Sequence, residues 1–150
     1  MKKVEVLIVN KSNNALPRYE TIGSAGMDIR ANIDKPMYAH EGCTVLVPTG
    51  LYIALPIGYE FQVRPRSGLA LKYSVTILNS PGTVDSDYRG EIGIIIHNAG
   101  NELFEIKNRD RICQIVLAEV IHAEWKELDE IDKLPSSNRG GGGFGSTGNK

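Results

Sequence analysis

Residues 43–64 constrain the fold more than any other stretch, because apolar and polar side chains alternate there at the period of a β-strand. The last six residues, from Tyr59 to Arg64, alternate without interruption. Successive side chains of a strand point to opposite faces, so this pattern predicts a half-buried strand. Turn signals at residues 48–50 and 56–58 divide the whole stretch into three predicted strands.

Similar short runs recur along most of the chain, separated by Gly, Pro, Asn or Asp. They lie at residues 4–9, 24–31, 74–78, 91–97, 103–107 and 112–118. A single helical turn is predicted from Ser67 to Lys72. Short strands with turns at intervals of about 8 to 12 residues are typical of an all-β fold. We therefore expect an all-β, jelly-roll-like barrel with one short helix.

The 150 residues suit one domain, predicted over residues 1–135, followed by a Gly-rich arm over residues 136–150. Four consecutive glycines have too little to bury, so the free arm is expected to be flexible. The connector at residues 124–132 is acidic and is expected to be exposed, with Trp125 as its anchor.

Charge and composition narrow the possible functions. The net charge is −1 with acids and bases well mixed, so no basic stripe indicates nucleic-acid binding. No apolar run approaches the length that spans a bilayer, so no membrane partner is expected. Cys43 and Cys113 are too far apart to predict a disulfide framework or a zinc site, which favours a reducing, cytoplasmic compartment. His40, His97 and His122 lack the spacing of metal ligands.

Residues 82–91 form a turn-rich loop between two predicted strands and gather a carboxylate, an aromatic ring and an arginine. Asp85 can take a proton from water, and Tyr88 can cover an apolar face of a ligand. An Asp in a turn usually hydrogen-bonds its own backbone, so Asp85 taken alone is better explained as structural. The pair of Asp85 and Asp87 is a weak indication of a metal, because no His or Cys stands near it.

Two other positions have the chemistry of an anion site. Ser67 is a good N-cap for the predicted helical turn, which would leave N–H groups free at Ser67 and Gly68 beside Arg66. A plain capped turn is the simpler explanation when that segment is considered alone. Gln114 interrupts an apolar run, and an unpaired buried amide costs about 1 to 3 kcal/mol, so it must bond a backbone group or face a ligand.

The arm sets Arg139, Phe144, Ser146 and Thr147 among glycines. Such a segment can close over a nucleotide, with glycine N–H groups and Arg139 on phosphate oxygens and Phe144 lying on a base. The alternative is a flexible terminus without function. A P-loop is excluded because its Gly-Lys-Ser/Thr pattern is absent.

Five segments, in order along the chain, resemble the signature segments of the homotrimeric dUTP pyrophosphatases (dUTPases). They lie at residues 24–31, 64–72, 78–91, 108–118 and 139–148. The resemblance implies hydrolysis of dUTP to dUMP and pyrophosphate, with Mg²⁺ carried by the triphosphate. Such an activity limits uracil incorporation into DNA and supplies dUMP for dTMP synthesis. The resemblance also implies a homotrimer whose active sites combine the loop of one subunit, the phosphate segments of a second and the arm of the third.

The same resemblance implies roles for single residues. Asp85 is implied to orient and deprotonate the attacking water, and Asp28 to lie near the metal through water. Contacts to uracil and deoxyribose are implied for Asn79, Gly82, Val84, Tyr88 and Phe144. Contacts to the phosphates are implied for Arg66, Ser67, Gly68, Gln114, Arg139, Ser146 and Thr147. Two positions depart from the family pattern, since Gly is common where Arg109 stands and Ala where Cys113 stands.

Three other functions stay open. A dCTP deaminase of the same fold would need a general-base Glu, and the segments around Asp85 and Phe144 argue against it. A nucleotide-sensing regulatory trimer is disfavoured because every implied catalytic position is filled. A nucleic-acid-binding β-barrel is disfavoured by the charge balance.

Overall fold

Most of the chain is extended, as the alternating pattern predicts. The structure is a computed structural model that describes residues 2–143. The strands in this range are β1 (Leu7–Asn10), β2 (Gly26–Arg30), β3 (Met37–Ala39), β4 (Thr44–Ala54), β5 (Tyr59–Arg64), β6 (Val75–Ile77), β7 (Gly82–Val84), β8 (Glu91–Asn98), β9 (Phe104–Ile106) and β10 (Arg111–Glu119). They are joined by one short α-helix, α1 (Ser67–Tyr73), and one turn of 3₁₀ helix, η1 (Ile131–Lys133).

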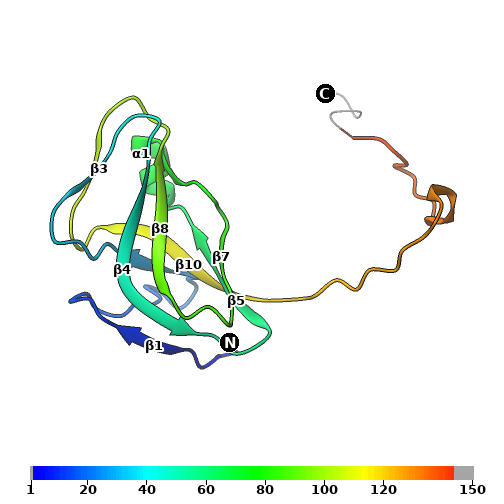
Figure 1. Cartoon of the computed structure of the whole chain (residues 1–150), viewed down its shortest axis with the longest axis horizontal. Coiled ribbons are helices and arrows are strands. Elements are labelled where there is room, and N and C mark those ends of the chain that lie inside the picture. The colour runs from blue at the N-terminus through cyan, green and yellow to red at the C-terminus, as the bar shows by residue number, and fades with distance from the viewer. Residues whose placement is uncertain (1, 144–150) are drawn as a thin grey trace.

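Two four-stranded antiparallel sheets enclose the core (Figure 1). The first has the strand order β1-β4-β8-β6 and the second β2-β10-β5-β7, while β3 and β9 form a separate pair. Both sheets contribute buried side chains to one cluster, such as Val47 and Ile94 from the first and Phe61 and Ile115 from the second. The predicted all-β fold with one short helix is confirmed. The sheets are not closed into one, so the structure approximates the predicted barrel.

Strand β4 runs through the turn predicted at residues 48–50, so the predicted division into two strands there is wrong. The pairing of β4 with β8 shifts register between Pro48 and Tyr52, which makes this place a β-bulge. Gly50 has a φ of 69°, and a Cβ there would lie 2.8 Å from the backbone nitrogen of Ser12. Residues 48–50 belong to one continuous strand, because β4 pairs with β8 both before and after the bulge.

The strands predicted before and after the segment at residues 82–91 are β6 and β8. β6 and β8 are antiparallel neighbours, with Ile77 opposite Ile96. Between them the chain first enters the other sheet, where β7 pairs with β5 and Gly82 lies opposite Val63. The loop between β7 and β8 therefore connects the two sheets.

Helix α1 begins with Ser67 as its first helical residue, so the prediction of Ser67 as N-cap is wrong by one position. The N-cap is Arg66, which is extended and makes no side-chain capping bond. The carbonyl of Arg66 accepts the N–H groups of Leu69 and Ala70 at 3.1 and 3.0 Å. The cap is the residue whose carbonyl accepts these first helical bonds. Ser67 follows it and is exposed in the first turn.

The corner before β10 has a backbone shape that favours glycine. Arg109 has a φ of 72°, in the left-handed region. Its N–H donates to the carbonyl of Ala31 at 3.0 Å, and its carbonyl accepts Nη1 of Arg30 at 2.8 Å. These bonds hold the corner in place although the residue carries a Cβ.

Replacing Arg109 by Gly is expected to raise the free energy of unfolding by about 0.5 to 1 kcal/mol. The left-handed conformation costs a residue with a Cβ about 1 to 2 kcal/mol, and the greater backbone freedom of unfolded Gly removes part of the gain. Urea unfolding followed by circular dichroism measures the change. Arg109→Ala is the matched control, because it removes the guanidinium but keeps the Cβ. An equal gain in both variants would contradict the explanation.

The two cysteines occupy different environments. Cys113 is buried within β10, and burial raises the pKa of its thiol, so the side chain acts as a small neutral core group. Cys43 is exposed just before β4. Core packing therefore accounts for Cys113 at a position where Ala is common in the family that the sequence resembles.

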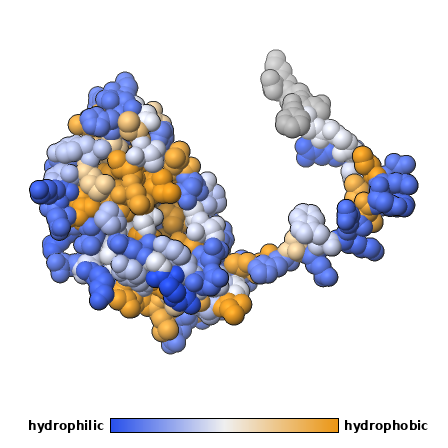
Figure 2. Space-filling model, viewed as in Figure 1, coloured by the Kyte–Doolittle hydropathy of each residue, from blue (hydrophilic) through white to orange (hydrophobic). Residues whose placement is uncertain are grey.

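Beyond β10 the chain leaves the two sheets and is almost entirely exposed (Figures 1 and 2). Trp125 is 92% exposed and Ile121 is 94% exposed. The prediction that Trp125 anchors the connector is wrong within one chain, because this extended segment does not fold back onto the sheets. The predicted boundary at residue 135 stays a prediction. None of the helices at residues 2–143 is long and apolar enough to cross a membrane.

Candidate active site

A cavity of about 140 Å³ lies where β7 and the start of β8 meet β5 and β6. Its walls are apolar where Val63, Ile77 and Ile95 contribute, and polar groups enter from the connecting segments. Five residues predicted from the sequence line this one cavity: Asn79, Gly82, Val84, Asp85 and Tyr88. A flat ligand with a polar edge suits such a site, since apolar walls cover its faces and a few polar groups orient it.

The loop between β7 and β8 is held by bonds within itself. The N–H of Tyr88 donates to the carbonyl of Asp85 at 3.2 Å, which closes a turn. Nη1 of Arg89 donates to the carbonyls of Ser86 and Tyr88 at 2.7 and 2.8 Å. These bonds leave the side chain of Asp85 exposed at the cavity. A carboxylate there can orient water and accept its proton.

Two glycines give neighbouring polar side chains the room they occupy. A Cβ on Gly82 would lie 2.9 Å from Nδ2 of Asn79, so the absence of a Cβ lets the amide approach the strand. A Cβ on Gly90 would lie 2.3 Å from the hydroxyl oxygen of Tyr88. That hydroxyl donates to the carbonyl of Glu91 at 2.9 Å, which fixes the ring beside the cavity. Asn79 and Tyr88 are thus positioned by the residues that follow them.

A second group of predicted residues gathers around the carboxylate of Asp28. Oδ1 of Asp28 lies 3.2 Å from Nε of Arg66 and accepts Nε2 of Gln114 at 3.3 Å. Oδ2 accepts Nη1 of Arg111 at 3.2 Å. The side chain of Asp28 is only 13% exposed, so these charge-assisted bonds are partly shielded from solvent. The side-chain amide of Gln114 is therefore hydrogen-bonded, as a polar group in an apolar strand requires.

Arg111 belongs to this cluster, although no role was predicted for it from the sequence. A register shift between Arg111 and Cys113 in the pairing of β10 with β2 is a β-bulge. It puts Arg111 and Gln114 on one face, opposite Arg30 and Asp28, although strict alternation would put residues three apart on opposite faces. Period-two alternation contains no signal for this contact.

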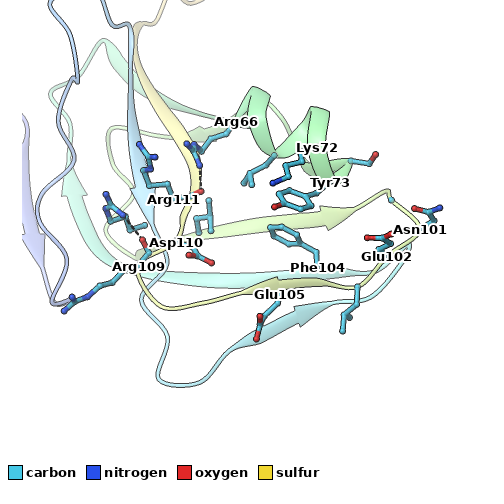
Figure 3. A pocket seen from close by; sticks show the side chains of 16 residues that line it. Arg66, Lys72, Tyr73, Asn101, Glu102, Phe104, Glu105, Arg109, Asp110 and Arg111 are labelled. Carbon is cyan, nitrogen blue, oxygen red and sulfur yellow. Dashed lines mark hydrogen bonds between the residues drawn. The ribbon is translucent and has the colours of Figure 1, made fainter.

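The cluster borders a cavity of about 700 Å³ (Figure 3). Arg66 and Arg111 lie at one end, where Nη1 of Arg66 donates to the carbonyl of Arg111 at 2.8 Å. At the other end the rings of Tyr73 and Phe104 pack with centroids 5.4 Å apart, and Nζ of Lys72 lies over the Tyr73 ring. The basic end can bind an anion, because guanidinium groups pair well with phosphate.

The remaining predicted residues lie outside these two groups. Ser67 and Gly68 are exposed at the start of α1. Arg139 lies in an exposed turn, where its Nε donates to the carbonyl of Gly142 at 2.6 Å. Phe144, Ser146 and Thr147 lie outside the described residues. Asp85 and Arg66 line different cavities, so the two halves of the predicted site are separate within one chain.

Comparison with known proteins shows the family of this chain. A family model described as dUTPase matches residues 12–148. The chain belongs to the dUTPase family. The deoxyuridine 5'-triphosphate nucleotidohydrolase of Fusobacterium nucleatum is 52% identical over 148 residues, and the match covers 99% of each chain. The protein of the same name from Cytophaga hutchinsonii is 54% identical over 143 residues, which cover 95% of this chain and 91% of that one.

A solved dUTPase shares the fold. The enzyme of Staphylococcus bacteriophage 80alpha, in complex with dUPNHPP, aligns with a TM-score of 0.82 at 25% identity. The alignment covers 96% of this chain and 98% of the phage chain. The similarity therefore extends over the two sheets and is not confined to the signature segments.

Within residues 2–143, no group of three or more His, Cys, Asp or Glu side chains is arranged to hold a metal ion. Asp28 is the carboxylate of the basic cluster, and both of its oxygens already face cationic or amide donors. The contact of Asp28 with a metal through water therefore stays a prediction.

Proposed function

We propose that this chain hydrolyses dUTP between the α- and β-phosphates and releases dUMP and pyrophosphate. Membership of the dUTPase family supports the proposal. The observation that carries it is the exposed carboxylate of Asp85, which lines one cavity with the amide of Asn79 and the ring of Tyr88. The activity would limit uracil incorporation into DNA and supply dUMP for dTMP synthesis.

In the proposed mechanism Asp85 orients a water molecule and accepts its proton. The water oxygen forms a bond to the α-phosphorus, and the bond from that phosphorus to the bridging oxygen of pyrophosphate breaks. Placing the water against phosphorus removes much of the entropic part of the barrier. The role of Asp85 therefore depends on the loop that carries it.

We assign the selection of uracil to the cavity and its rim. Backbone groups between Asn79 and Tyr88, with the Asn79 amide, match the donors and acceptors of the uracil edge. Gly82 and Val84 let the ring lie close to β7, where a methyl group at C5 would not fit. Tyr88 packs against the deoxyribose and leaves no room for a 2′-hydroxyl, and Phe144 covers the base from the arm.

We assign the phosphate chain to Arg66, Ser67, Gly68 and Gln114, with Arg139, Ser146 and Thr147 from the arm. Support comes from the bonds through which Asp28 orients both Arg66 and Gln114. A pre-oriented guanidinium loses little side-chain entropy on binding phosphate. Mg²⁺ carried by the triphosphate would be held near Asp28 through water, and when bound it neutralises charge on the departing pyrophosphate.

We propose that the active protein is a cytoplasmic homotrimer with shared sites. Support comes from the separation of the Asp85 cavity and the Arg66 cluster within one chain. The extended segment with exposed Ile121 and Trp125 also favours a neighbouring subunit as its partner, because large apolar side chains are seldom left in water. Residues 136–150 would act as the arm that closes over a neighbouring site. The free thiols of Cys43 and Cys113 suit a reducing compartment.

One observation disfavours a dCTP deaminase. The Glu that lines the cavity is Glu91, and its Oε1 accepts the backbone N–H groups of Thr49 and Gly50 at 3.1 and 2.7 Å. A carboxylate bonded in this way is turned toward β4 and is poorly placed to act as a general base on a cytosine ring.

Measuring pyrophosphate and ammonia released from dUTP, dCTP, dTTP and UTP tests the proposal. We expect pyrophosphate from dUTP, with kcat/KM for the other three nucleotides lower by about 10²-fold or more. Ammonia from dCTP would instead indicate a deaminase. Tight binding of dUTP without release of pyrophosphate would indicate a nucleotide sensor.

A further inference from the structure

The bulge in β4 leaves two buried N–H groups without a partner in the strand ladder. Pro48 lies opposite Gly93 and Tyr52 opposite Glu91, so three residues of β4 face one residue of β8. Thr49 and Gly50, inside the bulge, are both buried. Buried backbone donors need an acceptor, and the regular pairing of β4 with β8 does not supply one here.

The carboxylate of Glu91 supplies both acceptor contacts. Its Oε1 accepts the N–H of Thr49 at 3.1 Å and the N–H of Gly50 at 2.7 Å. The bulge is otherwise satisfied by Thr49, whose hydroxyl donates to the carbonyl of Ile92 at 2.6 Å and accepts the N–H of Leu51 at 3.2 Å. Glu91 is therefore tied to β4 by two bonds to one oxygen.

Glu91 is also the residue on which the Asp85 loop ends. It is the first residue of β8, and its carbonyl accepts the hydroxyl of Tyr88. Glu91 is also among the residues that line the cavity of Asp85. The side chain of Glu91 thus bonds the bulge while its main chain bonds the loop, and a shift at one end would be transmitted to the other.

We propose that Glu91 is a positioning residue, whose two bonds to the β4 bulge hold the Asp85 loop and Tyr88 in their productive place. This inference rests on the proposed function, because the loop is assumed to carry the water-activating carboxylate. In this role Glu91 transfers no proton, and its Oε1 faces the β4 bulge. The role requires an oxygen acceptor that reaches the N–H groups of Thr49 and Gly50. The negative charge of the carboxylate is secondary.

Three substitutions of Glu91 distinguish the position of its acceptor oxygen from its negative charge. Glu91→Gln keeps an oxygen at the same distance and removes the charge, so kcat/KM for dUTP is expected to stay within about threefold of wild type. Glu91→Asp keeps the charge but is one methylene shorter, and Glu91→Ala has no acceptor. Both are expected to lower kcat/KM by about 10- to 100-fold, since a displacement of about 1 Å can cost 10²-fold.

Thr49→Val is the matched control for general damage to the bulge. It removes the hydroxyl that serves Ile92 and Leu51 but leaves both bonds to Glu91 possible. We expect a lower melting temperature with kcat and KM within about twofold of wild type, measured where circular dichroism shows the variants folded. An equal loss of kcat/KM in Thr49→Val and Glu91→Ala would overturn the inference.

The remaining outcomes are also decisive. Activity retained by Glu91→Asp and lost by Glu91→Gln would show that charge matters, and wild-type kinetics in all three variants would show that Glu91 positions nothing. If the wild type released no pyrophosphate from dUTP, the proposed function would fail. The positioning role of Glu91 would then be tested by calorimetric binding of α,β-imido-dUTP. Weaker binding by Glu91→Ala and Glu91→Asp but not by Glu91→Gln would support the role, and equal binding by all three would overturn it.

Discussion

Replacing Asp85 by Asn is expected to lower kcat for dUTP by about 10² to 10⁴, the usual contribution of a general base. The amide has the same shape but cannot accept the proton of the attacking water. Binding should persist, because the cavity and the self-bonded loop that shapes it are unchanged. Pyrophosphate release measures kcat, and calorimetry with α,β-imido-dUTP measures affinity.

Asp87→Asn is the matched control for Asp85→Asn. Asp87 lies in the same exposed loop but does not line the cavity, so its kcat should equal that of wild type. Unchanged turnover in Asp85→Asn would remove Asp85 from the proposed mechanism.

Mixing two inactive variants extends the experiment to the shared site. Asp85→Asn damages the loop of its own chain, and Arg66→Ala damages the phosphate cluster of its own chain. If each site combines the loop of one subunit with the cluster of another, refolding the two variants together creates some sites with both parts intact. Activity should then reappear in the mixture. A mixture that assembles and stays inactive would contradict the shared site.

Ending the chain after Asn138 is expected to leave a folded oligomer that has lost about 10²-fold or more of its kcat/KM for dUTP. The truncation removes Arg139 and the glycine-rich residues proposed to close over the phosphates. The sheets and their core end at β10, so folding should not depend on the missing part. Circular dichroism and sedimentation test the fold and the assembly, and pyrophosphate release tests activity.

A shorter truncation is the control for the arm. Removing only Asn149 and Lys150 leaves the segment that resembles the fifth dUTPase signature intact, and activity should be kept. The activity of Arg139→Ala should lie between those of the two truncations, because this variant loses one proposed phosphate contact and keeps the others. Full hydrolysis by the chain that ends at Asn138 would mean that the arm has no catalytic role.

Local patterns in the amino-acid sequence were enough to predict the fold class and the place of most strands. The alternation from Tyr59 to Arg64 became β5, with Phe61 and Val63 buried on one face. The loop residues that share a cavity are close in sequence, from Asn79 to Tyr88, and short-range pattern and resemblance found them. Such features are predictable because a residue's neighbours along the chain decide its backbone shape and its face.

Contacts that depend on strand register emerged only from the folded chain. Arg111 joins Asp28 because a bulge reverses its face, and Glu91 completes a bulge in a strand far away in the sequence. The bulge in β4 makes residues 48–50, which were predicted as a turn, part of one continuous strand. Periodicity reports which side of a strand is apolar, but which residues face each other depends on how all the strands pack around one core. That choice is global, so no window of sequence contains it.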